Sequence, residues 1–213
     1  MRFFWLLLVF VGFTAGQSHR DKEAALGKTL ADEFRRRTPP VNDGALLAYL
    51  TKLAARLNEF AQSPFRLTIE IAGDSNREAV GFPGGYLFVP LRLLANAESE
   101  SAVAAPVAHA LAHAISPLAT RQLGQAQIGD LATIPVIFMG GWSHAADGTL
   151  IPLAFRKVRD EQEAEAARLA AEWTAQAGMA DPALDTEEFA AVRERVRALL
   201  ALTRKPPSLR KAQ

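Results

Sequence analysis

Residues 107–114 read VAHALAHA, within an alanine-rich segment at residues 98–115 that is predicted to form a helix despite Pro106. Two histidines in this segment, His109 and His113, are four residues apart. At 3.6 residues per turn, this spacing places both imidazoles on one face of a helix, one turn apart. Such a helix offers two nitrogens to one zinc ion, although the same spacing also occurs on core helices that bind no metal.

The hydrolytic form of this pattern, HExxH, has a glutamate directly after the first histidine. That glutamate takes a proton from metal-bound water as the water attacks a carbonyl. Here the position is Ala110, and a methyl group cannot accept a proton. The ligand spacing is therefore present and the general base is absent.

A third ligand would have to come from another segment, and a long predicted helix at residues 152–177 carries acidic candidates. Alternatively, these acids form a solvated helical face that pairs with the basic side chains around it. The candidates are Asp160, Glu161, Glu163 and Glu165.

The rest of the chain predicts a predominantly helical α+β domain with a small sheet. We expect the sheet to lie over the histidine helix, with the helix at residues 152–177 crossing beside it. The apolar stripe predicted for residues 44–60 includes Leu47 and Phe60, and the alternation at residues 65–71 is typical of a half-buried strand. The predicted helices are at residues 20–37, 44–60, 98–115, 128–142 (a buried helix), 152–177 and from Thr186 onward, and the strands are at 65–71 and 86–89.

Residues 1–16 have the pattern of a secretory signal peptide, with Arg2, an apolar run at residues 3–13 and small residues before a polar segment. A hydrocarbon core needs about 20 apolar residues, so an uncleaved membrane anchor is the less favoured alternative. We expect an exported, periplasmic or extracellular protein with no stable membrane span after cleavage. A single domain would then occupy residues 17–205, followed by a basic, proline-containing tail at residues 206–213.

The composition of the chain further narrows the classes of protein to which it could belong. The chain has 213 residues, 49% of them hydrophobic, which is enough to bury a core. Its 24 basic and 23 acidic residues argue against a nucleic-acid partner. The absence of cysteine excludes disulfides, thiolate metal sites and thiol nucleophiles. The oligomeric state is not specified by the sequence.

The order of these motifs resembles that of the HtpX, CAAX-prenyl-protease and BepA-like zinc metallopeptidases. Residues 82–89, FPGGYLFV, precede the histidine helix as a Pro-Gly-Gly strand precedes HExxH in that family, and residues 163–169, EAEAARL, resemble its ExEAD motif. The resemblance covers about residues 25–211. It implies a zincin-like, gluzincin-type domain in which His109, His113 and Glu163 are the zinc ligands.

The sequence departs from the family pattern at positions that matter chemically. Ala110 replaces the catalytic glutamate, Ala167 replaces the aspartate that ends ExEAD, and Glu78 replaces an asparagine before the Pro-Gly-Gly strand. Lys205 replaces a histidine near the end of the chain. Independent losses of the base and of a supporting carboxylate would reduce the rate by about 10³–10⁶.

The resemblance therefore predicts an exported, metalloendopeptidase-like protein that keeps a His/His/Glu zinc site but is catalytically impaired. The strand around Gly84, Gly85 and Tyr86 is expected to be an exposed edge that pairs with extended or unfolded polypeptide. One alternative is an active zinc metalloendopeptidase that uses a displaced carboxylate such as Glu165. The other is a metal-free structural or partner-binding remnant.

Overall fold

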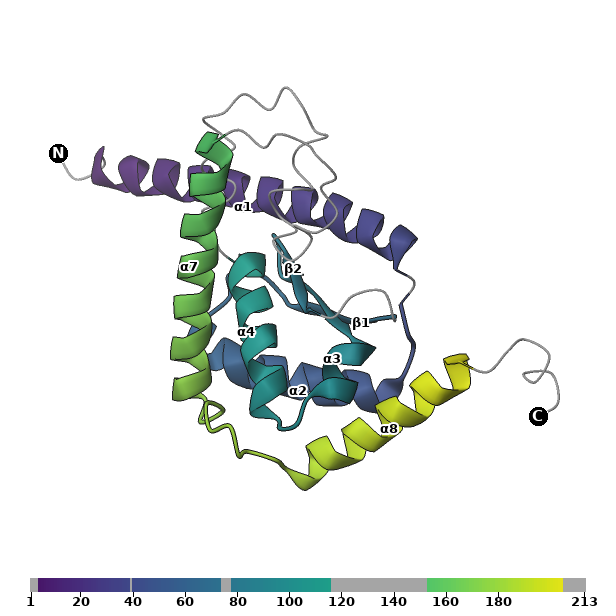
Figure 1. The fold of residues 1–213 in the computed structure, drawn as a ribbon. Helices are drawn as coiled ribbons and strands as arrows, with labels where there is room; N and C mark the ends of the chain where they lie inside the picture. Colours follow the sequence, from purple (N-terminus) through teal and green to yellow (C-terminus); the bar gives the residue numbers. More distant parts are fainter. Residues whose placement is uncertain (1–3, 39, 74–77, 116–152, 205–213) are drawn as a thin grey trace.

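The computed structural model describes residues 4–38, 40–73, 78–115 and 153–204, which form a mostly helical α+β domain around a three-stranded sheet (Figure 1). This confirms the predicted fold class. The elements are α1 (Phe4–Arg37), α2 (Gly44–Ala61), β1 (Thr68–Ala72), β2 (Val80–Phe82), β3 (Tyr86–Pro90), α3 (Leu91–Asn96), α4 (Ser101–Ile115), α7 (Leu153–Gln176) and α8 (Glu187–Arg204).

The sheet has the strand order β1-β3-β2. β3 pairs with β1 in parallel and with β2 in antiparallel, so it is the central strand. The prediction that the strand beginning at Tyr86 is an exposed edge is therefore wrong. β2 was not among the predicted strands, because a three-residue strand with Gly81 in the middle is too short to show an alternating pattern.

The two outer edges of the sheet differ. Beside β1, Pro40 bridges to Ala72 and the Val41 amide donates to the Ile71 carbonyl at 2.9 Å. Within the described residues, β2 has no strand on its outer side. The edge that could accept another strand is thus β2.

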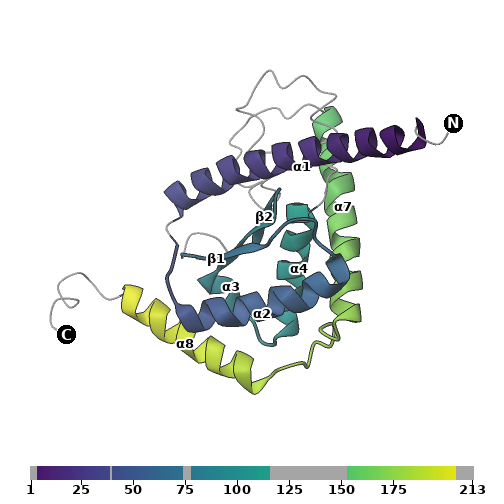
Figure 2. The same cartoon turned by 180° about the vertical axis from the view of Figure 1, so that it is seen from behind.

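Helices cover both faces of the sheet, α1 on one and α2 with α4 on the other (Figures 1 and 2). On the α1 face, Phe34 lies with its ring centroid 4.6 Å from that of Phe88 and 5.8 Å from that of Phe82. Beside this cluster, the Arg35 guanidinium pairs with the Glu70 carboxylate, with Nε 3.0 Å from both oxygens. The aromatic contacts and the ion pair hold α1 on the sheet.

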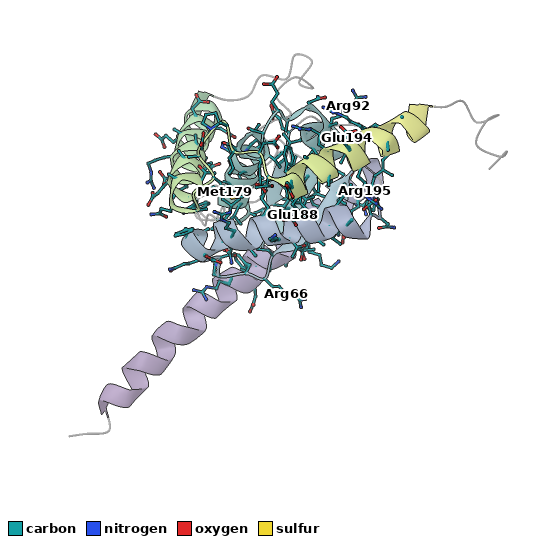
Figure 3. All side chains as sticks on the ribbon, turned by 90° about the horizontal axis from the view of Figure 1, so that it is seen from below. Arg66, Arg92, Met179, Glu188, Glu194 and Arg195 are labelled. Carbon is teal, nitrogen blue, oxygen red and sulfur yellow. The ribbon has the colours of Figure 1, made fainter. Side chains whose placement is uncertain are left out.

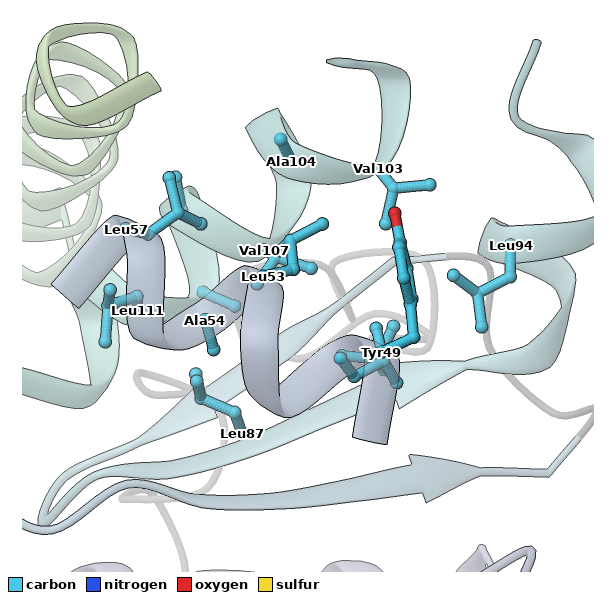
Figure 4. Packing of buried hydrophobic residues seen from close by; sticks show 14 of the residues in the cluster. Tyr49, Leu53, Ala54, Leu57, Leu87, Leu94, Val103, Ala104, Val107 and Leu111 are labelled. Atoms are coloured by element: carbon cyan, nitrogen blue, oxygen red, sulfur yellow. The ribbon is translucent and has the colours of Figure 1, made fainter. Parts of the chain in front are cut away.

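The main core lies between α2, α4 and the other face of the sheet (Figure 4). Leu53 and Leu57 of α2 face Val107 and Leu111 of α4 across this core, and Leu87 of β3 forms its floor. Leu47 and Phe60 are 40% and 39% exposed. The predicted stripe of α2 was therefore wrong at these two positions, which lie at its margins.

Several element boundaries differ from the prediction. α1 is continuous from Phe4, whereas a helix was predicted only from residue 20. β1 begins at Thr68, and the short helix α3 was not predicted. The predicted helices at residues 152–177 and from Thr186 onward are confirmed as α7 and α8, and Gly178 follows α7 with a φ of 65°.

Other predictions are not tested. The predicted buried helix at residues 128–142, Lys205 and the tail at residues 206–213 lie outside the described residues. The signal-peptide boundary at residue 16 stays a prediction. Among the described residues, no helix is both long and apolar enough to cross a membrane.

α8 lies along α2, and ion pairs join the two regions (Figure 3). Lys52 pairs with Glu188, and the Arg195 Nε lies 2.9 and 2.8 Å from the two carboxylate oxygens of Asp43. Asp43 also begins α2, because its Oδ1 accepts hydrogen bonds from the amides of Ala45 and Leu46 at 3.1 Å each. One buried carboxylate thus caps α2 and ties it to α8.

We expect Asp43→Ala to lower the free energy of unfolding by about 1–3 kcal/mol, because it removes a helix cap and a paired carboxylate together. Asp43→Asn keeps the cap oxygen and should lose less. Urea denaturation at constant m-value measures both differences. Equal losses in the two variants would contradict a capping role.

The difference in the free energy of unfolding between wild type and Asp43→Ala should also depend on pH, which provides a second control. Burial raises the pKa of Asp43, but the Leu46 amide and the Arg195 guanidinium outweigh it and hold that pKa below its ordinary value. A carboxylate whose pKa is lower in the folded state than in the unfolded state stabilises the fold when the pH is above its unfolded-state pKa. This stabilisation is lost as the pH falls through the folded-state pKa. The gap between wild type and Asp43→Ala should therefore shrink below about pH 4.

Candidate metal centre

α7 lies beside α4 (Figure 1), and the candidate site lies between these two helices, where His109 and His113 of α4 meet Glu163 of α7. α7 contributes Ala166, Ala170 and Trp173 to the core, and two of these three side chains are small. Small side chains allow two helix backbones to approach closely. This brings Glu163, one turn before Ala166, to the two histidines.

Three potential ligand side chains converge at this point. The Nε2 atoms of His109 and His113 are 3.1 Å apart, and Oε2 of Glu163 is 3.1 Å from Nε2 of His109. Oε1 of Glu163 is 3.6 Å from Nε2 of His113. A tetrahedral zinc ion with bonds of about 2.0–2.1 Å separates its ligand atoms by about 3.4 Å. The three residues therefore have the spacing of a zinc ligand set.

Hydrogen bonding alone does not satisfy this cluster. A neutral imidazole Nε2 carries either one proton or one lone pair. If His109 Nε2 donates to Glu163, it cannot accept from His113; if it accepts from His113, its lone pair faces the carboxylate. A cation is attracted to all three lone pairs at once, so the donor set fits a metal better than it fits a hydrogen-bond chain.

The third ligand is an ionised carboxylate. Hydrogen bonding to His109, and then to His113, holds the pKa of Glu163 far below its ordinary value, and this outweighs the opposing effect of burial. The side chains of His109, His113 and Glu163 are 34%, 25% and 36% exposed. The Glu163 carboxylate is thus negatively charged, and the three side chains are accessible to an ion and to a further ligand.

The surroundings of the ligands are poor in supporting groups. Within the described residues, neither histidine has a hydrogen bond at Nδ1, and Ala167 is exposed on α7. The two rings instead contact each other, with centroids 4.8 Å apart and planes at 67°.

The other acidic candidates do not join the cluster. Glu165 is two residues from Glu163, about 200° around the helix, and both of its oxygens lie 2.8 Å from the Arg168 guanidinium. Asp160 and Glu161 are exposed. A displaced carboxylate at Glu165 is therefore directed away from the histidines.

The glycines assigned to substrate binding have a different structural position. Gly84 and Gly85 form the turn between β2 and β3, with φ angles of 85° and 86° that favour glycine. The Gly85 amide donates to the Ala114 carbonyl at 3.2 Å. Substrate binding by Gly84, Gly85 and Tyr86 stays a prediction. Gly81, which lies in β2 against the backbone of α4, was not singled out from the sequence. The signal available in the sequence was a glycine two residues before the Pro-Gly-Gly turn.

A mostly helical α+β domain with a His/His/Glu cluster that could hold a metal is the class of protein that the fold and the site define. No protein-family model matches the chain. The chain is 30% identical over 131 residues to a Vibrio cholerae protein named "Putative beta-barrel assembly-enhancing protease". The match covers 60% of this chain and 27% of that protein, so the chain spans about a quarter of its relative's length. This similarity supports a distant relationship to BepA-like proteases.

Zinc should stabilise the full-length chain, because a ligand that binds only the native state raises its stability. At free zinc 100-fold above the dissociation constant, the gain is about 2.7 kcal/mol, or a rise in Tm of about 5–10 °C. Differential scanning calorimetry with and without zinc measures this rise. His113→Ala and Glu163→Gln should abolish most of it.

The matched control is Glu165→Gln, which removes the same charge from the same helix but leaves the cluster intact. It should retain the zinc-dependent rise in Tm. A wild-type chain whose Tm does not respond to zinc would contradict the metal site and favour a metal-free remnant.

Proposed function

We propose that this chain is an exported, metallopeptidase-like domain that binds zinc through His109, His113 and Glu163 and has little proteolytic activity. The observation that carries the proposal is the convergence of these three side chains next to a residue, Ala110, that cannot accept a proton. Zinc held there would supply a Lewis acid that polarises a carbonyl. The rest of the chemistry depends on the chain's own residues.

What these residues lack is a group that can transfer a proton, because Ala110 follows His109. Among the described residues, the cluster has no second carboxylate beside Glu163, and Glu165 is paired with Arg168 on another side of α7. A positioned general base usually contributes a factor of about 10²–10⁴ to the rate. Slow hydrolysis at the metal is therefore the expected limit, and an active enzyme that relies on Glu165 has no support in the geometry.

We further propose that the domain binds extended polypeptide along β2. This strand replaces Gly84, Gly85 and Tyr86 as the pairing edge, because it is the outer strand and the opposite edge of the sheet is covered by Pro40 and Val41. β2 also packs against α4 beside Ala110, so a peptide that extends the sheet would run close to the metal ligands. Strand addition satisfies backbone hydrogen bonds with little demand on sequence.

Export, to the periplasm or the extracellular space, is proposed from the apolar segment at residues 1–16. The side chains of α1 that pack on the sheet include Leu30, Ala31 and Phe34, which follow the predicted cleavage point. Removal of residues 1–16 would leave these contacts in place.

Ala110→Glu should increase zinc-dependent hydrolysis of unfolded casein by about 10²-fold or more, because it restores a proton acceptor directly after His109. The measurement is the rate of peptide release, with and without chelator. Ala110→Gln has the same length without the basic carboxylate and should show no increase. An Ala110→Glu variant that binds zinc normally but gains no activity would contradict the idea that the base alone is missing.

Labelled unfolded casein should bind the full-length Ala110→Gln variant without being cleaved, because strand addition at β2 needs no general base. Fluorescence anisotropy measures the binding. A folded peptide of similar length serves as the control and should bind much more weakly. Equal binding of the two peptides, or no binding of either, would count against the peptide-binding part of the proposal.

A further inference from the structure

We infer that Gly81 is a positioning residue for the metal centre, an inference that rests on the proposed zinc site. Gly81 lies in the middle of β2, and a Cβ added to it would lie 1.8 Å from the Ala110 carbonyl oxygen and 3.1 Å from the Ala114 amide nitrogen. Ala110 follows His109 in the chain, and Ala114 follows His113. β2 therefore contacts the backbone of α4 directly beside both histidine ligands.

The turn after β2 adds a second contact with the same helix. The Gly85 amide donates to the Ala114 carbonyl at 3.2 Å, near the C-terminal end of α4. Carbonyls in the last turn of a helix have no partner within the helix, so this bond also satisfies an otherwise free acceptor. The β2–β3 hairpin thus fixes α4 at two neighbouring points.

The hairpin cannot easily move away from α4, because α1 lies directly behind it. A Cβ added to Gly27 of α1 would lie 1.5 Å from the Pro83 carbonyl oxygen, and one added to Gly84 would lie 2.8 Å from the Ala24 Cα. α1 is itself held on the sheet by Phe34 and Arg35. A side chain at position 81 must therefore displace α4, or lift α1 from the sheet.

A displaced α4 changes the metal site, because two ligands lie on α4 and the third lies on α7. Real Cβ atoms essentially never approach another heavy atom within 3.0 Å, whereas the Gly81 Cβ would lie at 1.8 Å. The backbones would have to separate by about 1 Å, and metal–ligand distances tolerate about 0.2 Å. Gly81 thus acts on the metal through the position of the histidines.

The test compares Gly81→Ala with Gly44→Ala in the full-length chain. Gly44 is the matched control, because a Cβ there would have no atom within 4 Å. Zinc affinity is measured by competition with a chelator, and ligand geometry by the visible absorption of bound cobalt(II). We expect Gly81→Ala to bind zinc at least about 10-fold more weakly and to alter the cobalt spectrum. Gly44→Ala should match the wild type in both.

The outcomes separate the inference from the proposed function. A wild-type chain that binds neither metal overturns the zinc site itself. A wild-type chain that binds both, with a Gly81→Ala variant of unchanged affinity and spectrum, overturns the inference alone. The inference alone is also overturned if Gly81→Ala lowers the Tm of the metal-free protein without changing metal binding, because a purely structural role would not change the metal geometry.

Gly27→Ala gives an independent test if Gly81→Ala does not fold. It replaces a glycine within α1, where alanine favours the helix, and presses the hairpin onto α4 from the opposite side. Weaker zinc binding and an altered cobalt spectrum are expected here too. Unchanged metal binding by a folded Gly27→Ala variant would overturn the inference.

Discussion

The contact on which the site depends is the convergence of the Nε2 atoms of His109 and His113 and the carboxylate of Glu163, at 3.1–3.6 Å from one another. With one proton on each imidazole, these groups cannot all be hydrogen-bonded to one another. A cation at their centre would be attracted to all three side chains at once. A metal bound there would couple the position of α7 to that of α4, because its ligands would lie on both helices.

The packing around α4 consists of unusually close contacts. Alanine at positions 166 and 170 allows α7 to approach from one side, and Gly81 allows β2 to approach from the other. Protein interiors are close-packed, so a single added methyl group at such a contact moves a backbone. Small residues on α7 and β2 thus set the distance of α4 from both neighbours.

The sequence predicted the structure correctly where the pattern was local and extended over enough residues to be recognised. The stripe of α2, apart from Leu47 and Phe60, and the four-residue spacing of the histidines are local, and the structure bears them out. Strand order is not local. β2 has three residues, so the pattern could not show that it takes the edge and leaves Tyr86 on a central strand. The choice of Glu163 over Glu165 came from the family resemblance, and helical geometry then explains it.

The proposed function separates two contributions that are usually found together in metallopeptidases. Metal ligands and an edge strand contact a polypeptide before reaction as well as during it, so they mainly contribute binding. A general base contributes in the transition state, and only interactions that strengthen there raise the rate of the chemical step. We propose that this chain keeps the first contribution and loses the second, because Ala110 follows His109 beside the His/His/Glu cluster and no strand among the described residues pairs with the outer side of β2. The proposed role is therefore to hold an extended polypeptide near a metal rather than to cleave it.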